Sequence, residues 1–261
     1  MQPEIDLLGF PLKTFGLMLA LAFLACGLVA ARRLEELGRP RDWAYEMIFA
    51  ALVGGLVGSR LYWVIQHWST AKDDLVGNLF GGTGLVFYGG VIGGALCVLG
   101  WAWWRGVLDL YTVDVAAVPL AIGYAIGRIG CQLSGDGDYG KAWDGPWAMA
   151  YPHGTVPTTQ TVHPTPIYET VTMGLVAWGL WRLRDAVRPG ALFALWLVCA
   201  GVERFLVEFI RRNPTGALGL TTPQWESAAM IVGGGLWLAV MARRGGVRVA
   251  RATGVARPLA A

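Results

Sequence analysis

The chain is poor in charged residues. Asp, Glu, Lys and Arg make up 15% of its 261 residues, whereas a soluble globular protein carries about 25%. Hydrophobic residues reach 55%, and the mean hydropathy is +0.48, so too few polar side chains are present to cover a water-soluble body of this size. The net charge is only +3, and we expect no nucleic-acid partner. The composition predicts a polytopic membrane protein.

Cysteine is scarce, and its placement excludes two common uses. Cys26, Cys97, Cys131 and Cys199 are scattered through apolar or Gly-rich segments, and none forms a CxxC pair. We therefore expect neither a disulfide framework nor a zinc site. We interpret the cysteines as small apolar residues that fill helix contacts. Cys131 is the exception, because it lies in a motif discussed below.

Apolar stretches of about 18–25 residues, long enough to cross a bilayer as helices, recur along the chain. There are seven of them, at residues 10–31, 44–68, 84–104, 111–133, 166–183, 191–210 and 224–242. The predicted fold is all-α, with seven transmembrane helices in a single domain at residues 1–242. We place a small extracytoplasmic head at about 134–165. Residues 243–261 form a basic cytoplasmic tail, which we expect to be disordered and to contact anionic lipid.

The distribution of basic residues predicts the orientation. The first stretch is preceded by Glu4 and Asp6 with only Lys13, whereas a signal peptide begins with a positive region, so we interpret it as an uncleaved helix. Most of the 21 Lys and Arg residues then fall in the loops on the C-terminal side of the membrane. The loops on the other side hold few. Loops rich in basic residues are typically cytoplasmic. The N-terminus is predicted outside and the C-terminus in the cytoplasm.

Several residues that are costly to bury lie within the apolar stretches. An ionised side chain at mid-bilayer costs about 2.5–3.5 kcal/mol, so such residues are expected to be paired or functional. In the predicted topology the outer half of the membrane holds Arg60, Tyr88, Arg128, Glu169, Arg204 and Glu208. Their clustering predicts a polar cavity with an excess of positive charge that opens to the outer leaflet. Salt bridges that merely hold the bundle together are the alternative. Asp114 lies near a helix end, where contact with the interface suffices.

Two arginines in different helices suit an anionic lipid. Arg204, Glu208 and Arg211 are spaced four and three residues apart and share a helix face. A guanidinium group is planar, remains protonated when buried and matches the oxygens of a phosphate. Arg128 and Arg204, meeting near the outer leaflet, therefore favour a phospholipid headgroup, with Glu208 orienting one of them.

The segment that follows Arg128 is rich in glycine. Gly135, Gly137 and Gly140 alternate with Asp136 and Asp138, and glycines let the backbone turn sharply and approach a ligand. A dinucleotide site is excluded because no strand precedes the glycines and no helix follows them. An EF-hand is excluded because Gly140 stands where an oxygen ligand is required.

A second motif, His163-Pro164-Thr165-Pro166-Ile167-Tyr168-Glu169, lies where an apolar stretch begins. A helix start explains the prolines, which are common there. It does not explain why His163, Tyr168 and Glu169 cluster where the helix enters the membrane. A third motif, Phe87-Tyr88-Gly89-Gly90, starts another stretch, and its small residues predict close helix packing.

Taken together, these motifs resemble the bacterial prolipoprotein diacylglyceryl transferase family. The resemblance covers nearly the whole chain and includes Gly127-Arg128-Ile129-Gly130, the His163–Glu169 motif and the segment from Arg204 to Arg211. It implies a multi-pass inner-membrane enzyme, active at the outer leaflet, that needs no metal or cofactor. Phosphatidylglycerol would donate its diacylglyceryl group to the lipobox cysteine of a prolipoprotein signal peptide. A thioether would form, and glycerol phosphate would leave.

The resemblance also implies roles for individual residues. The expected catalytic residues are Tyr88, Arg128, His163, Arg204 and Glu208. The expected phosphatidylglycerol contacts are Arg60, Arg128, Gly135, Asp136, Gly137, Gly140, Tyr168, Glu169 and Arg204.

Two residues depart from the common family pattern. Tyr88 stands where many members have His, and Cys131 stands where many have Asn. A phenol with a pKa near 10 is a poor base, so we expect Tyr88 to be a hydrogen-bond donor, with His163, Glu169 or Asp136 as the base. Two alternatives to the leading interpretation stay open: a related lipid-headgroup transferase with another acceptor, and a small transporter. A transporter would carry polar residues through both halves of the membrane.

Overall fold

The protein is built from long helices, each of which coincides with one predicted apolar stretch. The computed structural model describes residues 1–7, 10–71 and 86–249. Its long helices are α1 (Thr14–Glu36), α2 (Asp42–Gln66), α5 (Phe87–Trp104), α6 (Leu110–Ser134), α7 (Thr165–Leu183), α8 (Ala191–Val207) and α9 (Thr222–Arg243). Short helical turns are α3 (Trp68–Ala71), η1 (Glu208–Ile210) and η2 (Ala217–Gly219). Within the described residues, α1, α2, α6 and α9 are long and apolar enough to cross a membrane, and Gly89–Trp104 is a shorter apolar helix.

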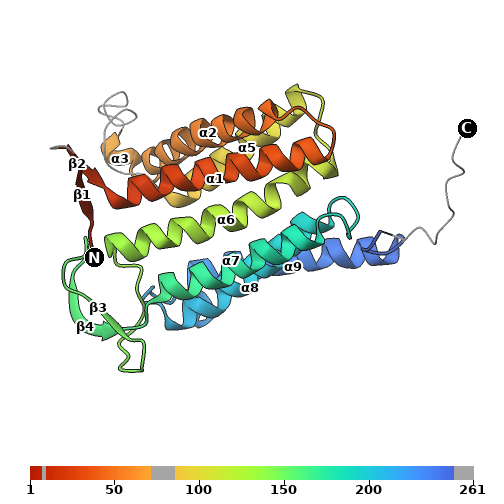
Figure 1. Cartoon of the computed structure of the whole chain (residues 1–261). Coiled ribbons are helices and arrows are strands. Elements are labelled where there is room, and N and C mark those ends of the chain that lie inside the picture. The colour runs from red at the N-terminus through yellow and green to blue at the C-terminus, as the bar shows by residue number, and fades with distance from the viewer. Residues whose placement is uncertain (8–9, 72–85, 250–261) are drawn as a thin grey trace, which may run out of the picture.

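The helices form two groups on either side of α6. In Figure 1, α1, α2 and α5 lie together on one side, and α7, α8 and α9 lie together on the other. The main packing pairs agree with this view, because α2 packs on α5, α1 and α7 pack on α6, and α8 packs on α9. The N-terminus and the C-terminal end of α9 lie at opposite ends of the helices (Figure 1).

Glycines allow the closest of these helix contacts, between α2 and α5. A Cβ added to Gly93 would lie 2.2 Å from the carbonyl oxygen of Gly54. A Cβ added to Gly58 would lie 2.3 Å from the carbonyl oxygen of Gly89. Small residues at this spacing let two backbones approach directly. The contact fixes the first turn of α5, which carries Tyr88.

Asp114 joins α6 to the start of α8. Its carboxylate accepts hydrogen bonds from the backbone N–H groups of Gly190 and Phe193, both at 2.8 Å. Those N–H groups belong to the first turn of α8, where no helical carbonyl can accept them. Asp114 therefore has a structural role, in agreement with the sequence interpretation, although its capping of a neighbouring helix was not predicted.

Two small antiparallel hairpins add to the predicted all-α fold. β1 (Glu4–Leu7) pairs with β2 (Phe10–Lys13), and β3 (Met149–Tyr151) pairs with β4 (Thr158–Val162) in the head. The predicted helix start at residue 10 was wrong, because 10–13 pair with the preceding strand. Apolar content alone does not separate a strand from the helix that continues it.

The chain after α9 is partly ordered, contrary to the prediction of a disordered tail from residue 243. Arg188 N–H donates to the carbonyl of Val247 at 2.8 Å, and Val249 N–H donates to the carbonyl of Ala186 at 3.1 Å. This segment therefore pairs with the turn between α7 and α8. The rest of the predicted tail, residues 250–261, lies outside the described residues.

Candidate active site

Glu169 lies at the centre of a buried ion-pair cluster. It sits one turn into α7, just after Pro164 and Pro166, and its side chain is 0% exposed. Arg128 of α6 contacts its Oε2 through Nε, and Arg211 donates from Nη1 to its Oε1 at 3.0 Å. Arg204 of α8 places Nη1 at 3.8 Å from the same Oε1. The hydroxyl of Tyr124 donates to Oε2 at 2.9 Å. The predicted meeting of Arg128 and Arg204 is thus confirmed, with a carboxylate between them.

Asp138 and Glu208 complete the cluster. Asp138 bridges Arg128 and Arg211 with its two oxygens. Oε2 of Glu208 lies 3.0 Å from Nη2 of Arg204 and 3.8 Å from Nε of Arg211. The three arginines are therefore matched by the carboxylates of Asp138, Glu169 and Glu208. The prediction of excess positive charge was wrong for this cluster, because Asp138 belongs to a loop that folds back onto the helices.

The charges of the arginines control the ionisation of Asp138. Burial opposes ionisation of this carboxyl group, but the positive charges of Arg128 and Arg211 outweigh that effect and lower its pKa. Asp138 is therefore an anion at neutral pH and a poor proton acceptor.

The cluster leaves hydrogen-bonding capacity unused. Within the described residues, four buried side-chain N or O atoms have no hydrogen-bond partner, and three of them lie here. They are Oε2 of Glu203, Nη1 of Arg204, which lies 3.8 Å from Glu169, and Oε2 of Glu208, which lies 3.0 Å from Nη2 of Arg204 without hydrogen-bond geometry. An unsatisfied buried polar group costs about 1–3 kcal/mol. An anion that supplies an oxygen would therefore give Nη1 of Arg204 the hydrogen bond that it lacks.

The glycines after α6 explain how Asp138 reaches the arginines. Gly135 ends α6 with φ 59°, and a Cβ there would lie 2.7 Å from the Cα of Gly154. Gly137 has φ 94°. At Gly140 a Cβ would lie 2.6 Å from the carbonyl oxygen of Ile210. These glycines pack the loop between the head and the end of α8, and their contact with a lipid stays a prediction.

His163 and Tyr168 lie together in a second, aromatic group. The His163 ring stacks on Trp143 with centroids 4.4 Å apart, and its Nδ1 is 3.4 Å from the hydroxyl of Tyr168. Trp147 donates from Nε1 to the same hydroxyl at 2.7 Å. In the described part of the chain no hydrogen bond or ion pair joins His163 or Tyr168 to the three arginines. The aromatic group is linked to the cluster through the backbone, since Tyr168 precedes Glu169.

Cys131 and Asp136 lie beside the cluster. Sγ of Cys131 is 3.8 Å from Nη1 of Arg128 and 3.6 Å from Oδ2 of Asp138. Asp136 accepts a hydrogen bond from the backbone N–H of Asp138 at 3.3 Å. The ligand atoms of Cys131, Asp136 and Asp138 lie within 4.8 Å of one another, but Asp138 is already paired with two guanidinium groups, whose positive charge opposes a metal cation.

Arg60 and Tyr88 are not joined to the cluster by the contacts described above. Arg60 is 8% exposed on α2, which packs mainly against α5. Tyr88 is the second residue of α5, and its side chain lies outside what the structure describes. Their functional roles stay predictions.

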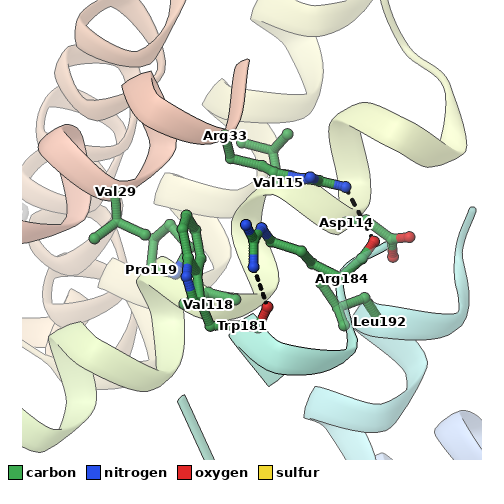
Figure 2. Close-up of a pocket in the computed structure, with 9 residues that line it drawn as sticks. All are labelled: Val29, Arg33, Asp114, Val115, Val118, Pro119, Trp181, Arg184 and Leu192. Atoms are coloured by element: carbon green, nitrogen blue, oxygen red, sulfur yellow. Dashed lines mark hydrogen bonds between the residues drawn. The ribbon is translucent and has the colours of Figure 1, made fainter. Parts of the chain in front are cut away.

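A pocket at the opposite end of the helices has a different character. Figure 2 shows the side chains of Arg33 and Arg184 running past each other in opposite directions, with Arg33 ending near Asp114 and Arg184 donating to the backbone carbonyl of Trp181. Arg33 pairs with Asp185 at 2.7 Å, Arg184 pairs with Glu36 at 2.9 Å, and Arg184 lies over the Trp181 ring at 4.1 Å. Because both arginines are paired with acids, this group joins α1 to the turn after α7.

Sequence reasoning missed Tyr124, Asp138 and Glu203 as site residues. Tyr124 lies four residues before Arg128 on one helix face, so helical spacing was the available signal. Glu203 is an acid within an apolar stretch and satisfies the criterion that identified Arg204. Asp138 lies in a loop, where no periodicity predicts its direction.

Comparisons with known proteins agree with the motifs. The model of the family described as prolipoprotein diacylglyceryl transferase matches residues 4–240. A phosphatidylglycerol–prolipoprotein diacylglyceryl transferase of Clostridium tetani is 31% identical over 89% of this chain and 94% of that protein. Proteins of the same name from Bordetella avium and Vibrio vulnificus are 32% and 30% identical, over 88% and 92% of this chain and 90% and 92% of their own lengths.

Proposed function

Because the chain belongs to the prolipoprotein diacylglyceryl transferase family, we propose that it transfers the diacylglyceryl group of phosphatidylglycerol to a prolipoprotein. The acceptor is the lipobox cysteine of the signal peptide. Its sulfur forms a bond to the terminal glyceryl carbon as the bond from that carbon to the phosphate oxygen breaks. Glycerol phosphate leaves with the electron pair, and the thiol proton passes to a base.

The convergence of three guanidinium groups on Glu169 is the observation that supports this function most strongly. Arg128, Arg204 and Arg211 come from α6, from α8 and from the turn after it, and they reach one carboxylate. One carboxylate offers two oxygens, and Nη1 of Arg204 has no hydrogen-bond partner. A phosphate offers more acceptor positions to these donors than the carboxylate does.

The arginines act on the leaving group. Negative charge develops on the phosphate as the carbon–oxygen bond breaks, and preorganised donors in a dry site stabilise that charge. When the phosphate takes its place, Glu169 and Glu208 hold the guanidinium groups in position from the side. Arg60, Gly135, Gly137 and Gly140 are proposed to contact the remainder of the lipid.

The ion pairs narrow the choice of base. Glu169 and Asp138 are each ion-paired with at least two arginines, and both oxygens of each carboxylate are engaged, which leaves them little room to contact the thiol. Asp136 and His163 form no ion pair with the arginines within the described residues. These two side chains, with Tyr88 as a hydrogen-bond donor, remain the proposed groups around the thiol.

We place the site at the outer leaflet of the inner membrane. All seven long helices would cross the bilayer, with the N-terminus outside. The opposite placement of the N-terminus and the C-terminal end of α9 in Figure 1 supports an odd number of crossings. The cluster lies at the end of the helices that carries the head, because Asp138 follows directly on α6. The signal peptide and phosphatidylglycerol would both enter from that leaflet.

The proposal is tested with purified protein in vesicles that contain phosphatidylglycerol and a lipobox peptide. Release of glycerol phosphate and lipidation of the peptide are measured together. We expect Arg128→Ala and Arg204→Ala each to lower kcat by about 10²–10³-fold, the effect of losing a donor to a developing anion. Arg182→Ala is the matched control, because Arg182 is exposed near the opposite end of α7. Full activity in both site variants would contradict the proposal.

A further inference from the structure

Glu203 is a buried acid without a cation of its own. It lies on α8, is 8% exposed, and its Oε2 has no hydrogen-bond partner. Within the described residues Glu203 forms no ion pair, although Arg204 follows it in the chain. Successive residues of a helix point in different directions, so Arg204 turns instead toward Glu169 and Glu208.

The charges of the neighbouring cluster are balanced without Glu203. Arg128, Arg204 and Arg211 are engaged with the carboxylates of Asp138, Glu169 and Glu208, as described above. A fourth carboxylate would add a buried negative charge with no partner, which is strongly unfavourable. A neutral carboxyl group avoids that cost and needs only hydrogen bonds.

The neighbours of Glu203 show where a proton on it would go. Its carboxyl group lies within side-chain hydrogen-bonding reach of Tyr124, and the charges of Glu169, Arg128 and Arg204 act on it. A tyrosine hydroxyl has one proton, and that of Tyr124 is donated to Glu169 at 2.9 Å. The oxygen of Tyr124 also accepts from Nη2 of Arg128 at 3.4 Å, and toward Glu203 it can act only as an acceptor. A hydrogen bond between the two therefore requires the proton to be on Glu203.

We propose that Glu203 is a protonated positioning residue that donates to Tyr124 and so directs the Tyr124 hydroxyl toward Glu169. The chain of donors runs from Glu203 on α8 through Tyr124 on α6 to Glu169 on α7. These hydrogen bonds join the three helices that carry the site, and they fix the position of Glu169 relative to the arginines. The consequence for catalysis rests on the proposed function, whereas the protonation state does not.

Paired substitutions test the role of the proton. Gln at 203 is nearly isosteric and keeps a neutral donor, whereas Leu has similar size and no donor. In the transfer assay we expect Glu203→Gln to stay within about twofold of the unsubstituted chain and Glu203→Leu to fall about tenfold, the effect of one lost hydrogen bond. A folded Glu203→Gln protein that is as inactive as Glu203→Leu would overturn the proposal, because it would show that a carboxylate is required.

A double-mutant cycle separates positioning from general damage to the fold. Tyr124→Phe removes the hydroxyl on which Glu203 acts. We therefore expect Glu203→Leu to cause no further loss in the Tyr124→Phe background, whereas independent effects would multiply. Multiplying effects would contradict the link through Tyr124.

Infrared spectroscopy reads the proton without any assay of transfer. The carbonyl stretch of a protonated carboxyl group is distinct from that of a carboxylate and shifts in D₂O. We expect one such band in the unsubstituted protein at neutral pH and its loss in Glu203→Gln. If the two spectra do not differ there, Glu203 is ionised and the inference fails, even if the transferase assay succeeds. If the band is present while lipid transfer is absent, the proposed function fails and the proton assignment stands.

Discussion

Glu169 holds together three positive charges that would otherwise repel one another inside the protein. Arg128, Arg204 and Arg211 all contact its carboxylate, and removing one partner of a buried ion pair typically costs about 3–5 kcal/mol. Under the proposed function, a phosphate would take the position of this carboxylate. Glu169 would then both assemble the arginines and compete with the substrate for them.

Asp138 provides a prediction on pH. Its pKa is lowered by Arg128 and Arg211 despite burial, so its contribution to stability is present above the unfolded value, about 3.9. The contribution is lost as the pH falls through the lower folded value. We expect the thermal midpoint in detergent to fall more steeply below about pH 4 in the unsubstituted chain than in Asp138→Asn. The variant should be the less stable protein at pH 7.

Asp144→Asn is the control for that experiment. Asp144 lies in the head, accepts a hydrogen bond from Thr161, and forms no ion pair within the described residues. Its variant should follow the unsubstituted chain through the acid range. Parallel curves for Asp138→Asn and the unsubstituted chain would show that the arginine contacts contribute nothing to stability.

Tyr88 provides a prediction on the chemistry of the thiol. If its hydroxyl donates a hydrogen bond in the site, Tyr88→Phe should lower kcat by about 2–10-fold, the effect of one such bond. Tyr88→His should raise activity if the tyrosine replaces a base, because imidazole accepts protons near neutral pH. Rates of peptide lipidation for the three proteins decide this. Unchanged activity in Tyr88→Phe would remove Tyr88 from the site.

At the scale of the elements, the contact between α2 and α5 determines where the start of α5 lies. We expect Gly58→Ala to destabilise the protein by about 1–3 kcal/mol, the usual cost of forcing an extra group into a packed contact. Activity should fall as well, because Tyr88 moves with the first turn of α5. Denaturant titration in mixed micelles gives the stability, and the transfer assay gives the activity.

Gly100→Ala is the matched control, because Gly100 lies on α5, the helix that packs on α2, and has nothing within 4 Å of an added Cβ. It should leave both stability and activity close to those of the unsubstituted chain. Equal stability of the Gly58 and Gly100 variants would show that the close approach of α2 and α5 is not needed.

The sequence could predict those elements whose formation is dominated by one local contribution to the free energy. A long apolar helix is specified by the cost of exposing its backbone to lipid, so the bounds of α6 and α7 are predicted to within one residue at each end. The hairpins depend on pairing between separate segments, as between β3 and β4, which local composition does not encode. Which helices are neighbours depends on such pairing too, and the position of α6 between two groups was therefore not predicted.

At the scale of the whole molecule, charge is concentrated at both ends for different reasons. The cluster around Glu169 has buried polar atoms without partners. At the other end, Arg33 and Arg184 are paired with Glu36 and Asp185. Hydropathy identified Arg128, Arg204 and Glu169 because ionisable residues stand out within apolar stretches. It could not distinguish a site from a structural junction, since that depends on which acids fold onto which arginines.

The proposed orientation of the molecule, with the N-terminus and the head outside, is open to a direct test. Gln160 is exposed on β4 in the head, and Arg244 is exposed just after α9. We expect Gln160→Cys to react with a membrane-impermeant maleimide in intact spheroplasts, and Arg244→Cys to react only after permeabilisation. The unsubstituted chain is the control for its own cysteines, which lie within α1, α5, α6 and α8. The reverse pattern would place the arginine cluster at the cytoplasmic leaflet. Labelling of both sites from outside would require an even number of crossings.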